Sequence, residues 1–136
     1  MESISKHISY KEATHSNTAI RFGIENIPNK EQLENMQLVA KACFEPVREW
    51  YGKPIRINSF FRCDILNKKV KGSKTSQHVQ GKAIDIDAGS VEENKKIHDW
   101  IKANVRFDQL IWEYGGAWIH VSFDLGKNRN QSFSVG

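Results

Sequence analysis

The pattern that most limits how this chain can fold lies near its C-terminus. Two runs rich in β-branched and aromatic residues, "QLIWEY" at 109–114 and "AWIHVSF" at 117–123, are separated only by Gly115 and Gly116. Two consecutive glycines accept positive φ, which is typical of a two-residue turn between antiparallel strands. We therefore expect a β-hairpin here, followed by a polar tail that is coil or a frayed last strand.

This turn fixes the register of the predicted hairpin. It pairs Glu113 with Trp118 and Ile111 with His120. Because side chains alternate between the two faces of a strand, Glu113 and His120 are then diagonal neighbours on one face. A carboxylate and an imidazole are thus predicted to share one wall. Simpler roles stay open for both, as a solvent-facing strand residue for Glu113 and a hydrogen-bonded sheet residue for His120.

Two earlier segments also have the composition of strands. "PIRINSFF" at 54–61 and "KAIDIDA" at 82–88 both alternate apolar and polar residues. In the second segment Asp85 and Asp87 share one face, and the isoleucines beside them fill the other. A polar loop of roughly twenty residues separates the two segments, and its length suggests a function.

Helical patterns account for most of the remaining chain. From Asn29 onward, apolar residues spaced three and four apart predict one long amphipathic helix. Pro46 lies inside this pattern and lacks a backbone donor, so we expect it to kink or divide the helix, which Gly52 then ends. Two Ser-x-x-Glu sequences typical of helix starts lie at 9–12 and 90–93. Together these elements predict an α+β fold with a small, mainly antiparallel sheet and helices packed on one face.

The composition fits a single globular domain that spans residues 1–136, because 39% of the residues are hydrophobic and 26% are charged. The net charge is only +4 and no long basic run is present, so no nucleic-acid site is predicted. No apolar stretch reaches the roughly 18 residues of a membrane-spanning helix, and residues 1–17 lack the apolar core of a secretory signal. Cys43 and Cys63 are too few for a disulfide framework and are expected to be buried thiols.

The segment "SQHVQGKAIDI" at 76–86 contains both His78 and Asp85. Burying a carboxylate is costly unless a cation or hydrogen-bond donors meet it. With His120, these residues supply two imidazoles and one carboxylate, the ligand type of hydrolytic zinc sites that keep one position open. Glu113 is then a candidate general base. The histidine and the aspartate can equally form hydrogen bonds with their own surroundings, so the residue types alone leave both interpretations open.

One longer motif combines small residues with the histidines and the aspartate. Its members are Ser76, His78, Gly81, Ala83 and Asp85, followed by Trp118 and His120 on a late strand. This motif resembles that of the M15 family of zinc peptidases, which includes D-Ala-D-Ala carboxypeptidases and related phage endolysins. A second set resembles the family's Ser-Gly-Tyr-Arg strand end, its Asn and its Gly-rich loop, and consists here of Ser59, Arg62, Asn67 and Gly72. The resemblance covers nearly the full length and implies the fold shared by Hedgehog signalling domains and DD-peptidases.

The resemblance implies that His78, Asp85 and His120 hold Zn²⁺. It also implies that Arg62 binds a substrate carboxylate or the developing oxyanion, and that Ser76 assists in binding substrate. A planar guanidinium suits bidentate recognition of a carboxylate such as the end of a peptidoglycan stem peptide. The implied activity is metal-assisted hydrolysis of a peptide bond in cell-wall peptidoglycan, of the carboxypeptidase or endopeptidase type.

The chain departs from the family pattern near the expected site. Many members place the catalytic acid three residues before the last histidine, where this chain has Ala117, so Glu113 is the candidate in its place. Phe60 and Phe61 replace the glycine and the tyrosine of Ser-Gly-Tyr-Arg, which is expected to alter substrate fit. Gly81 is expected to let the backbone pass close beneath the metal.

Other functions are compatible with these departures. Ala117 is also what a non-catalytic module of the same fold would show, such as a zinc-containing binding domain or a phage structural component. A binding domain similar to the signalling domain of Hedgehog proteins is a further alternative. We expect a monomer that is made in the cytoplasm and does not insert into membranes. If the gene is phage or prophage encoded, a holin-like lysis route would bring the protein to the cell wall.

Overall fold

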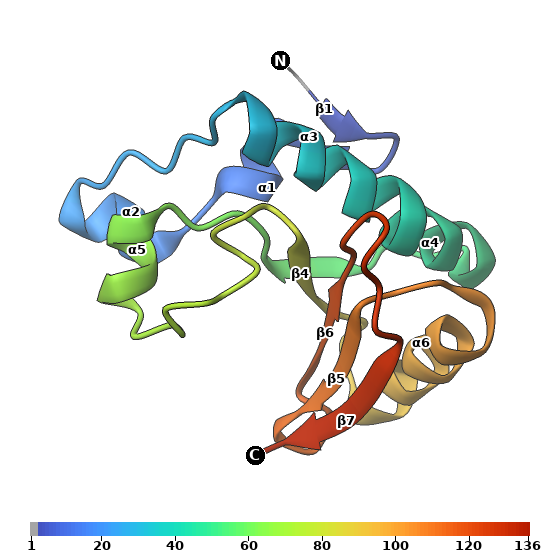
Figure 1. Cartoon of the computed structure of the whole chain (residues 1–136). Helices are drawn as coiled ribbons and strands as arrows, with labels where there is room; N and C mark the ends of the chain where they lie inside the picture. The colour runs from blue at the N-terminus through green and yellow to red at the C-terminus, as the bar shows by residue number, and fades with distance from the viewer. Residues whose placement is uncertain (1–2) are drawn as a thin grey trace.

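The computed structural model describes residues 3–136 as an α+β fold built on a five-stranded sheet (Figure 1). In the order in which they lie side by side, its strands are β3 (Arg56–Ser59), β4 (Ala83–Asp87), β6 (Trp118–Ser122), β5 (Gln109–Glu113) and β7 (Gln131–Val135). A smaller antiparallel sheet pairs β1 (Ser3–Ser5) with β2 (Ile8–Ser9). The α-helices are α1 (Tyr10–Thr14), α2 (Asn17–Phe22), α3 (Lys30–Val39), α4 (Glu45–Tyr51), α5 (Asp64–Lys69) and α6 (Val91–Asn104).

The larger sheet is mainly antiparallel, as predicted. Its β3–β4, β4–β6 and β5–β6 pairs are antiparallel, and only β5 and β7 run parallel. Strand β7 forms from the polar tail, and each of its residues is exposed. An exposed edge strand has no apolar face to bury, so its sequence lacks the alternation that identifies a half-buried strand.

The β5–β6 hairpin has the predicted register, with Glu113 opposite Trp118 and Ile111 opposite His120. The turn is longer than the predicted two residues, because Tyr114 belongs to it and starts a short 3-10 turn. Both of its glycines have positive φ, as expected. The turn takes one residue from each side, so the register is unchanged. The placement of a carboxylate and an imidazole on one face is therefore confirmed.

Strand β4 lies between β3 and β6, and its side chains alternate between the apolar and the polar face of the sheet. Ile84 and Ile86 are fully buried on one face, whereas Asp85 and Asp87 are half-buried on the other. This alternation confirms the prediction for the strand. It also places Asp85 directly opposite His120 of β6.

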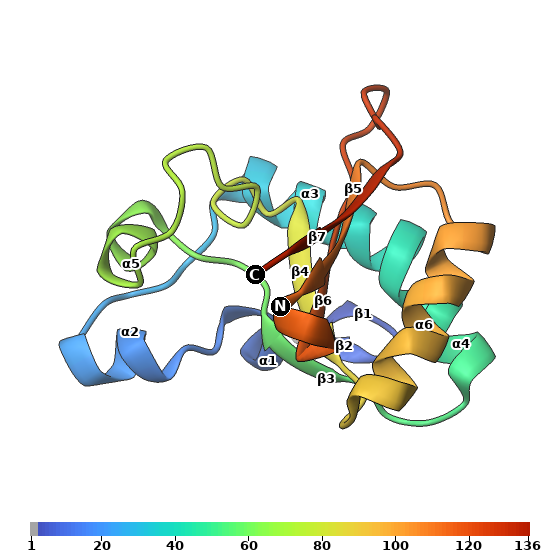
Figure 2. The same cartoon turned by 90° about the horizontal axis from the view of Figure 1, so that it is seen from below.

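The core lies between the apolar face of the sheet and two helical segments. Its largest members from the helices and the sheet are fully buried, namely Met36, Phe44, Ile97, Ile101, Ile84, Ile86 and Leu110. Figure 2 shows α3, α4 and α6 grouped on one side of the sheet. The face that carries Asp85 is lined by loop residues instead of helices. The packed core on the opposite face keeps the strands that carry the polar residues in place.

The long predicted helix has a π-helical turn just before Pro46, where a kink or a division was expected, and its backbone stays helical throughout. Helix α3 starts after Asn29 and is followed by a π-helical turn over Ala40–Phe44, after which α4 continues to Gly52. Pro46 sits in the first turn of α4, where a missing N–H breaks no hydrogen bond of that helix. Gly52 ends α4 with a φ of 72°.

The prediction of an unbroken polar loop between β3 and β4 is wrong, because α5 lies within it. A helix of six residues is too short to show a clear apolar period. Helix α5 contacts α2, and the two lie together at a distance from the main sheet in both views (Figures 1 and 2).

The two cysteines differ from each other in burial. Cys43 is buried, which raises the pKa of its thiol to about 12, whereas Cys63 is only half-buried. Neither forms a disulfide. Among the helices of residues 3–136, none has both the length and the hydrophobicity needed to cross a membrane.

Candidate metal centre

Three side chains from distant parts of the chain meet on the polar face of the sheet. Asp85 and His120 face each other across strands β4 and β6. His78 comes from the loop that precedes β4. One ligand atom from each of these residues lies within 4.8 Å of the other two. The three residues singled out in the sequence are therefore brought together by the fold.

The aspartate carboxylate lies between the two imidazoles. Nδ1 of His120 is 2.9 Å from Oδ1 of Asp85, and Nε2 of His78 is 3.2 Å from Oδ2. The other ring nitrogen of His78, Nδ1, is 2.7 Å from the backbone carbonyl oxygen of Phe60. A carbonyl can only accept a hydrogen bond, so Nδ1 carries a proton toward Phe60, and Nε2 is the ring nitrogen that faces the cluster.

The Phe60 carbonyl is a functional group that the sequence analysis missed, because a backbone oxygen has no signature in the sequence. Phe60 and Phe61 were expected to alter substrate fit. Both rings are instead buried in the core, with 1% and 2% of their surface exposed. Their rings therefore pack in the core and do not line the cleft. The backbone carbonyl of Phe60 orients His78.

The loop that carries His78 is held against α3. The side chains of Gln32 and Asn35 donate hydrogen bonds to the backbone oxygens of Val79 and Gln80, at 3.0 Å each. Gly81 has a φ of +75°, and a Cβ atom at this position would lie 2.4 Å from the carbonyl oxygen of Gln32. The close backbone approach expected at Gly81 is present, but it is to helix α3 and not to the metal centre.

The pKa values of the two carboxylates in the site, Asp85 and Glu113, are shifted in opposite directions. Burial alone would raise the pKa of Asp85, but the two imidazoles outweigh it and hold this pKa well below its usual range. The pKa of Glu113 is raised, first by burial and then by the negative charge of Asp85. Asp85 is thus an anion at neutral pH, whereas Glu113 takes up a proton at a higher pH than an ordinary glutamate does.

Arg62 lies beside this cluster and is more than half-buried. Its Nη2 donates to the hydroxyl of Ser76 at 3.2 Å, while its buried Nε has no acceptor among the described residues. Burial lowers the pKa of Arg62, and the charges of Asp85 and Glu113 raise it. A guanidinium stays charged under such shifts, so a cation lies beside the cluster in the lining of the cleft.

All of these groups line one cleft of about 980 Å³ on the polar face of the sheet. The predicted site residues that it contains are Arg62, Ser76, His78, Asp85, Glu113 and His120. Tyr114 and Trp118 form an aromatic pair in its wall, with ring centroids 5.1 Å apart. The cleft is large enough to accept several residues of a peptide.

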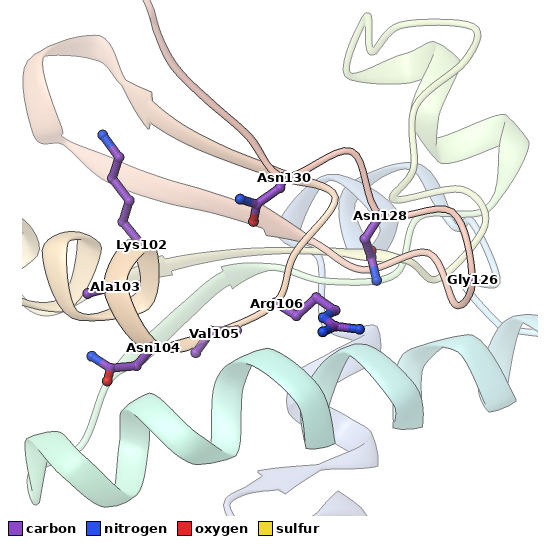
Figure 3. Close-up of a pocket in the computed structure, with 8 residues that line it drawn as sticks. All are labelled: Lys102, Ala103, Asn104, Val105, Arg106, Gly126, Asn128 and Asn130. Atoms are coloured by element: carbon purple, nitrogen blue, oxygen red, sulfur yellow. The ribbon is translucent and has the colours of Figure 1, made fainter.

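A second hollow, of about 660 Å³, lies between the end of α6 and the loop before β7. Figure 3 shows that the side chains of Lys102 and Arg106 point in different directions there. The lining contains no histidine, cysteine or carboxylate among the described residues. Among its described residues, the hollow therefore offers none of the imidazole, thiolate or carboxylate groups that hold zinc.

His7, Glu45 and Glu49 form another group whose ligand atoms lie within 4.8 Å of one another. Its carboxylates already have other partners. Glu45 accepts hydrogen bonds from Ser5 at 2.6 Å and from the backbone N–H of His7 at 2.9 Å, and Glu49 pairs with Lys6 at 3.2 Å. This group fastens the β1–β2 hairpin to α4.

The comparison with protein families agrees with the geometry of the cleft. The family model described as Peptidase M15 matches residues 6–122, which include every residue of the centre. The chain belongs to the peptidase M15 family. A comparison with curated proteins gives no match. Family membership makes a hydrolase of the metallopeptidase type the expected activity, and zinc the expected metal.

The three residues of this peptidase M15 centre fit a zinc ion. Two ligand atoms that are each about 2.1 Å from one tetrahedral zinc lie roughly 3.4 Å apart. Asp85 contacts His120 and His78 through its two different carboxylate oxygens, at 2.9 and 3.2 Å, and one ligand atom of each residue lies within 4.8 Å of the other two. The donor set of two imidazole nitrogens and one carboxylate is also typical of zinc sites that leave a position for substrate or water.

Proposed function

We propose that this protein is a zinc-dependent peptidase that hydrolyses peptide bonds in the stem peptides of bacterial peptidoglycan. The observation that carries the proposal is the convergence of His78, Asp85 and His120 in a cleft that also contains Glu113 and Arg62. The peptidoglycan substrate rests on the resemblance of the site motif to D-Ala-D-Ala carboxypeptidases and endolysins. Both the carboxypeptidase and the endopeptidase types fit a cleft of this size.

The proton transfers of the reaction are assigned to Glu113. Zinc held by the three ligands supplies a Lewis acid that polarises a carbonyl and makes water more acidic. Glu113 accepts a proton from the attacking water and returns it to the nitrogen of the leaving amine as the C–N bond breaks. Its raised pKa suits both steps, because a carboxyl group with a pKa nearer to neutral pH can both accept and donate a proton.

Substrate binding is assigned to Arg62 and Ser76. Arg62 lines the cleft and uses only Nη2 for Ser76, so a carboxylate or oxyanion of the substrate is the proposed acceptor for its remaining accessible donors. The Ser76 hydroxyl accepts from Nη2 and so holds the guanidinium in place. Arg62 would therefore act as a fixed donor for the charge on the terminal carboxylate or on the tetrahedral intermediate.

A non-catalytic zinc-containing module is the second candidate function. The observation that favours it is Ala117, an exposed residue at the position where many members of the family carry their catalytic acid. In such a module Glu113 would be only a wall residue of a binding cleft. The two candidates differ in what happens to a bound peptide, so a cleavage assay separates them.

The experiment is to digest purified muropeptides with the zinc-loaded protein and to identify the fragments by mass. The proposal expects cleavage at one type of bond, lost in Glu113→Ala while the zinc content stays the same. Glu34→Ala, which removes an exposed carboxylate from α3, is the matched control and should cleave normally. Intact muropeptides after incubation with zinc-loaded protein would support the non-catalytic module. Full activity of Glu113→Ala would remove Glu113 from the mechanism.

A further inference from the structure

The cleft contains a second arginine, Arg129, which the proposed metal chemistry does not use. Its Nε and Nη2 donate hydrogen bonds to the two carboxylate oxygens of Asp108, at 2.8 Å each, and its backbone N–H donates to the same group at 2.9 Å. The side chain of Asp108 is 2% exposed, whereas that of Arg129 is 51% exposed. A buried carboxylate thus fixes the orientation of a guanidinium whose outer part is open to the cleft.

The same carboxylate connects Arg129 to the loop of the metal centre. The side-chain amide of Gln77, the residue before His78, donates to Asp108 at 2.8 Å. Arg129 is therefore held in a fixed position relative to the proposed metal ligands. Asp108 uses only the Nε and Nη2 edge, so within the described part of the chain the Nη1 donors are left for an acceptor from outside.

Outside the proposed reaction centre, the charged groups that line the cleft are cations. Its two carboxylates, Asp85 and Glu113, both belong to the proposed reaction centre. Among the described residues, the remaining fully charged groups in the lining are cations, and they are Arg62, Lys71 and Arg129. Complementary charge is a common source of specificity, so the cleft is suited to a peptide that carries carboxylates.

The sheet gives the separation along β5 between Asp108, which orients Arg129, and the residue that pairs with His120. Asp108 directly precedes β5, and on this strand Ile111 lies opposite His120. At about 3.3 Å per residue, the three steps from Asp108 to Ile111 correspond to roughly 10 Å along the strand. An extended peptide covers the same distance in about three residues.

We propose that Arg129, oriented by Asp108, binds a carboxylate of the substrate about two or three residues from the cleaved bond. This inference rests on the proposed peptidase function and adds a substrate class to it, namely peptides with an acidic group at that distance. A guanidinium already fixed by one carboxylate loses little freedom when it binds a second, which suits it to such recognition.

The test uses pairs of synthetic peptides that differ only in glutamate or glutamine at one position, scanned over three positions on each side of the bond cut in muropeptides. The zinc-loaded full chain is compared with the double variant Asp108→Asn/Arg129→Gln, which replaces the ion pair by two amides and leaves no buried charge unpaired. Lys127→Gln is the matched control, because it removes a cation from the same loop but does not line the cleft.

We expect the unmodified protein to prefer glutamate at one position by about tenfold in kcat/KM, mainly through a lower KM. The double variant should lose this preference and cleave the glutamine peptide within about twofold of the unmodified rate, and Lys127→Gln should keep the preference. The proposal is overturned if no position shows a preference, or if the double variant loses activity on both peptides equally, since the latter is the signature of a purely structural ion pair.

Failure of the peptidase proposal would be recognised separately. If no peptide is cleaved, calorimetric binding of the same peptide pairs to the zinc-loaded protein decides the role of Arg129. Tighter binding of the acidic member, lost in the double variant, supports the inference without hydrolysis. Equal binding of both members overturns it.

Discussion

At the scale of single residues, the site depends on the contrast between two carboxylates. Asp85 is held ionised by the imidazoles of His78 and His120, whereas burial and the charge of Asp85 raise the pKa of Glu113. Neighbouring acids whose pKa values are pushed apart take different roles in catalysis. Asp85 is therefore suited to hold a cation and Glu113 to carry a proton.

The raised pKa of Glu113 predicts the pH dependence of the activity. Glu113 must be ionised to accept a proton from water, so kcat/KM should fall as the pH decreases through this raised pKa. The acid limb should lie above the ordinary glutamate value of about 4.3. A pH profile on a cleaved muropeptide, with the zinc content measured at each pH, tests this. A limb at or below the ordinary value, with zinc still bound, would rule out Glu113 as the base.

The Phe60 carbonyl orients His78 so that Nε2 faces the cluster as a zinc ligand. Removing this imidazole should therefore weaken zinc binding. His78→Ala should lose zinc and, with it, the stability that zinc adds to the folded state, which is about 2.7 kcal/mol when free zinc is 100 times the dissociation constant. Thermal unfolding with zinc and with a chelator provides the measurement. The melting temperature should depend on zinc in the unmodified protein and in His15→Ala, an exposed control. A zinc-dependent melting temperature in His78→Ala would contradict the assignment.

At the scale of elements, the loop before β4 is shaped by its contact with α3. Gly81 approaches the backbone of this helix so closely that a Cβ atom would lie 2.4 Å from the Gln32 carbonyl oxygen. Because His78 lies only three residues earlier, any displacement of the loop at Gly81 moves the imidazole as well. The spacing between His78 and Asp85 thus depends on a packing contact outside the cleft.

Gly81→Ala should therefore lower both the stability and the zinc affinity. We expect a loss of about 2–4 kcal/mol in the free energy of unfolding, from strain at positive φ and from the backbone clash. Gly52→Ala is the matched control, because Gly52 has a φ of +72° but open space around its Cβ position. It should lose only about 1–2 kcal/mol and keep full zinc affinity. Equal losses in the two variants, measured by urea unfolding and by chelator competition, would contradict this account.

Elements with strong local signals were predictable from the sequence. Gly115 and Gly116 specify the hairpin register, alternation places Asp85 on the polar face of β4, and Pro46 marks the place of the π-helical turn in the long helix. Helix α5 was not predicted, because it is too short to show a period, and strand β7 was predicted only as one of two alternatives for the tail, because it is too exposed to show one. Such elements depend on partners that are distant in the sequence.

Within the candidate site, the functional side chains were easier to predict than the groups that hold them in place. The motif identified His78, Asp85 and His120 by residue type and spacing. It did not identify the Phe60 carbonyl or the Asp108 carboxylate, whose contacts span 18 residues to His78 and 21 residues to Arg129. These supports act through a backbone atom and a long-range ion pair, neither of which a local pattern records.

At the scale of the whole molecule, the packed core and the reacting groups lie on opposite faces of the sheet. The helices α3, α4 and α6 pack on the apolar face of the sheet (Figures 1 and 2). The reacting groups line the cleft on the other face, together with residues from loops. A close-packed core resists displacement, so the strands that carry Asp85 and His120 keep their separation. Substrate can thus enter from the loop side without disturbing the core.

The central claim is that one zinc ion binds between His78, Asp85 and His120. Crystals of the zinc-loaded protein, measured at the zinc absorption edge, test it directly through the position of the anomalous difference peak. The account predicts one peak per chain, within bonding distance of Nε2 of His78, a carboxylate oxygen of Asp85 and Nδ1 of His120. A zinc-loaded crystal with no peak there, or with its peak at the His7 and Glu45 group, would contradict it.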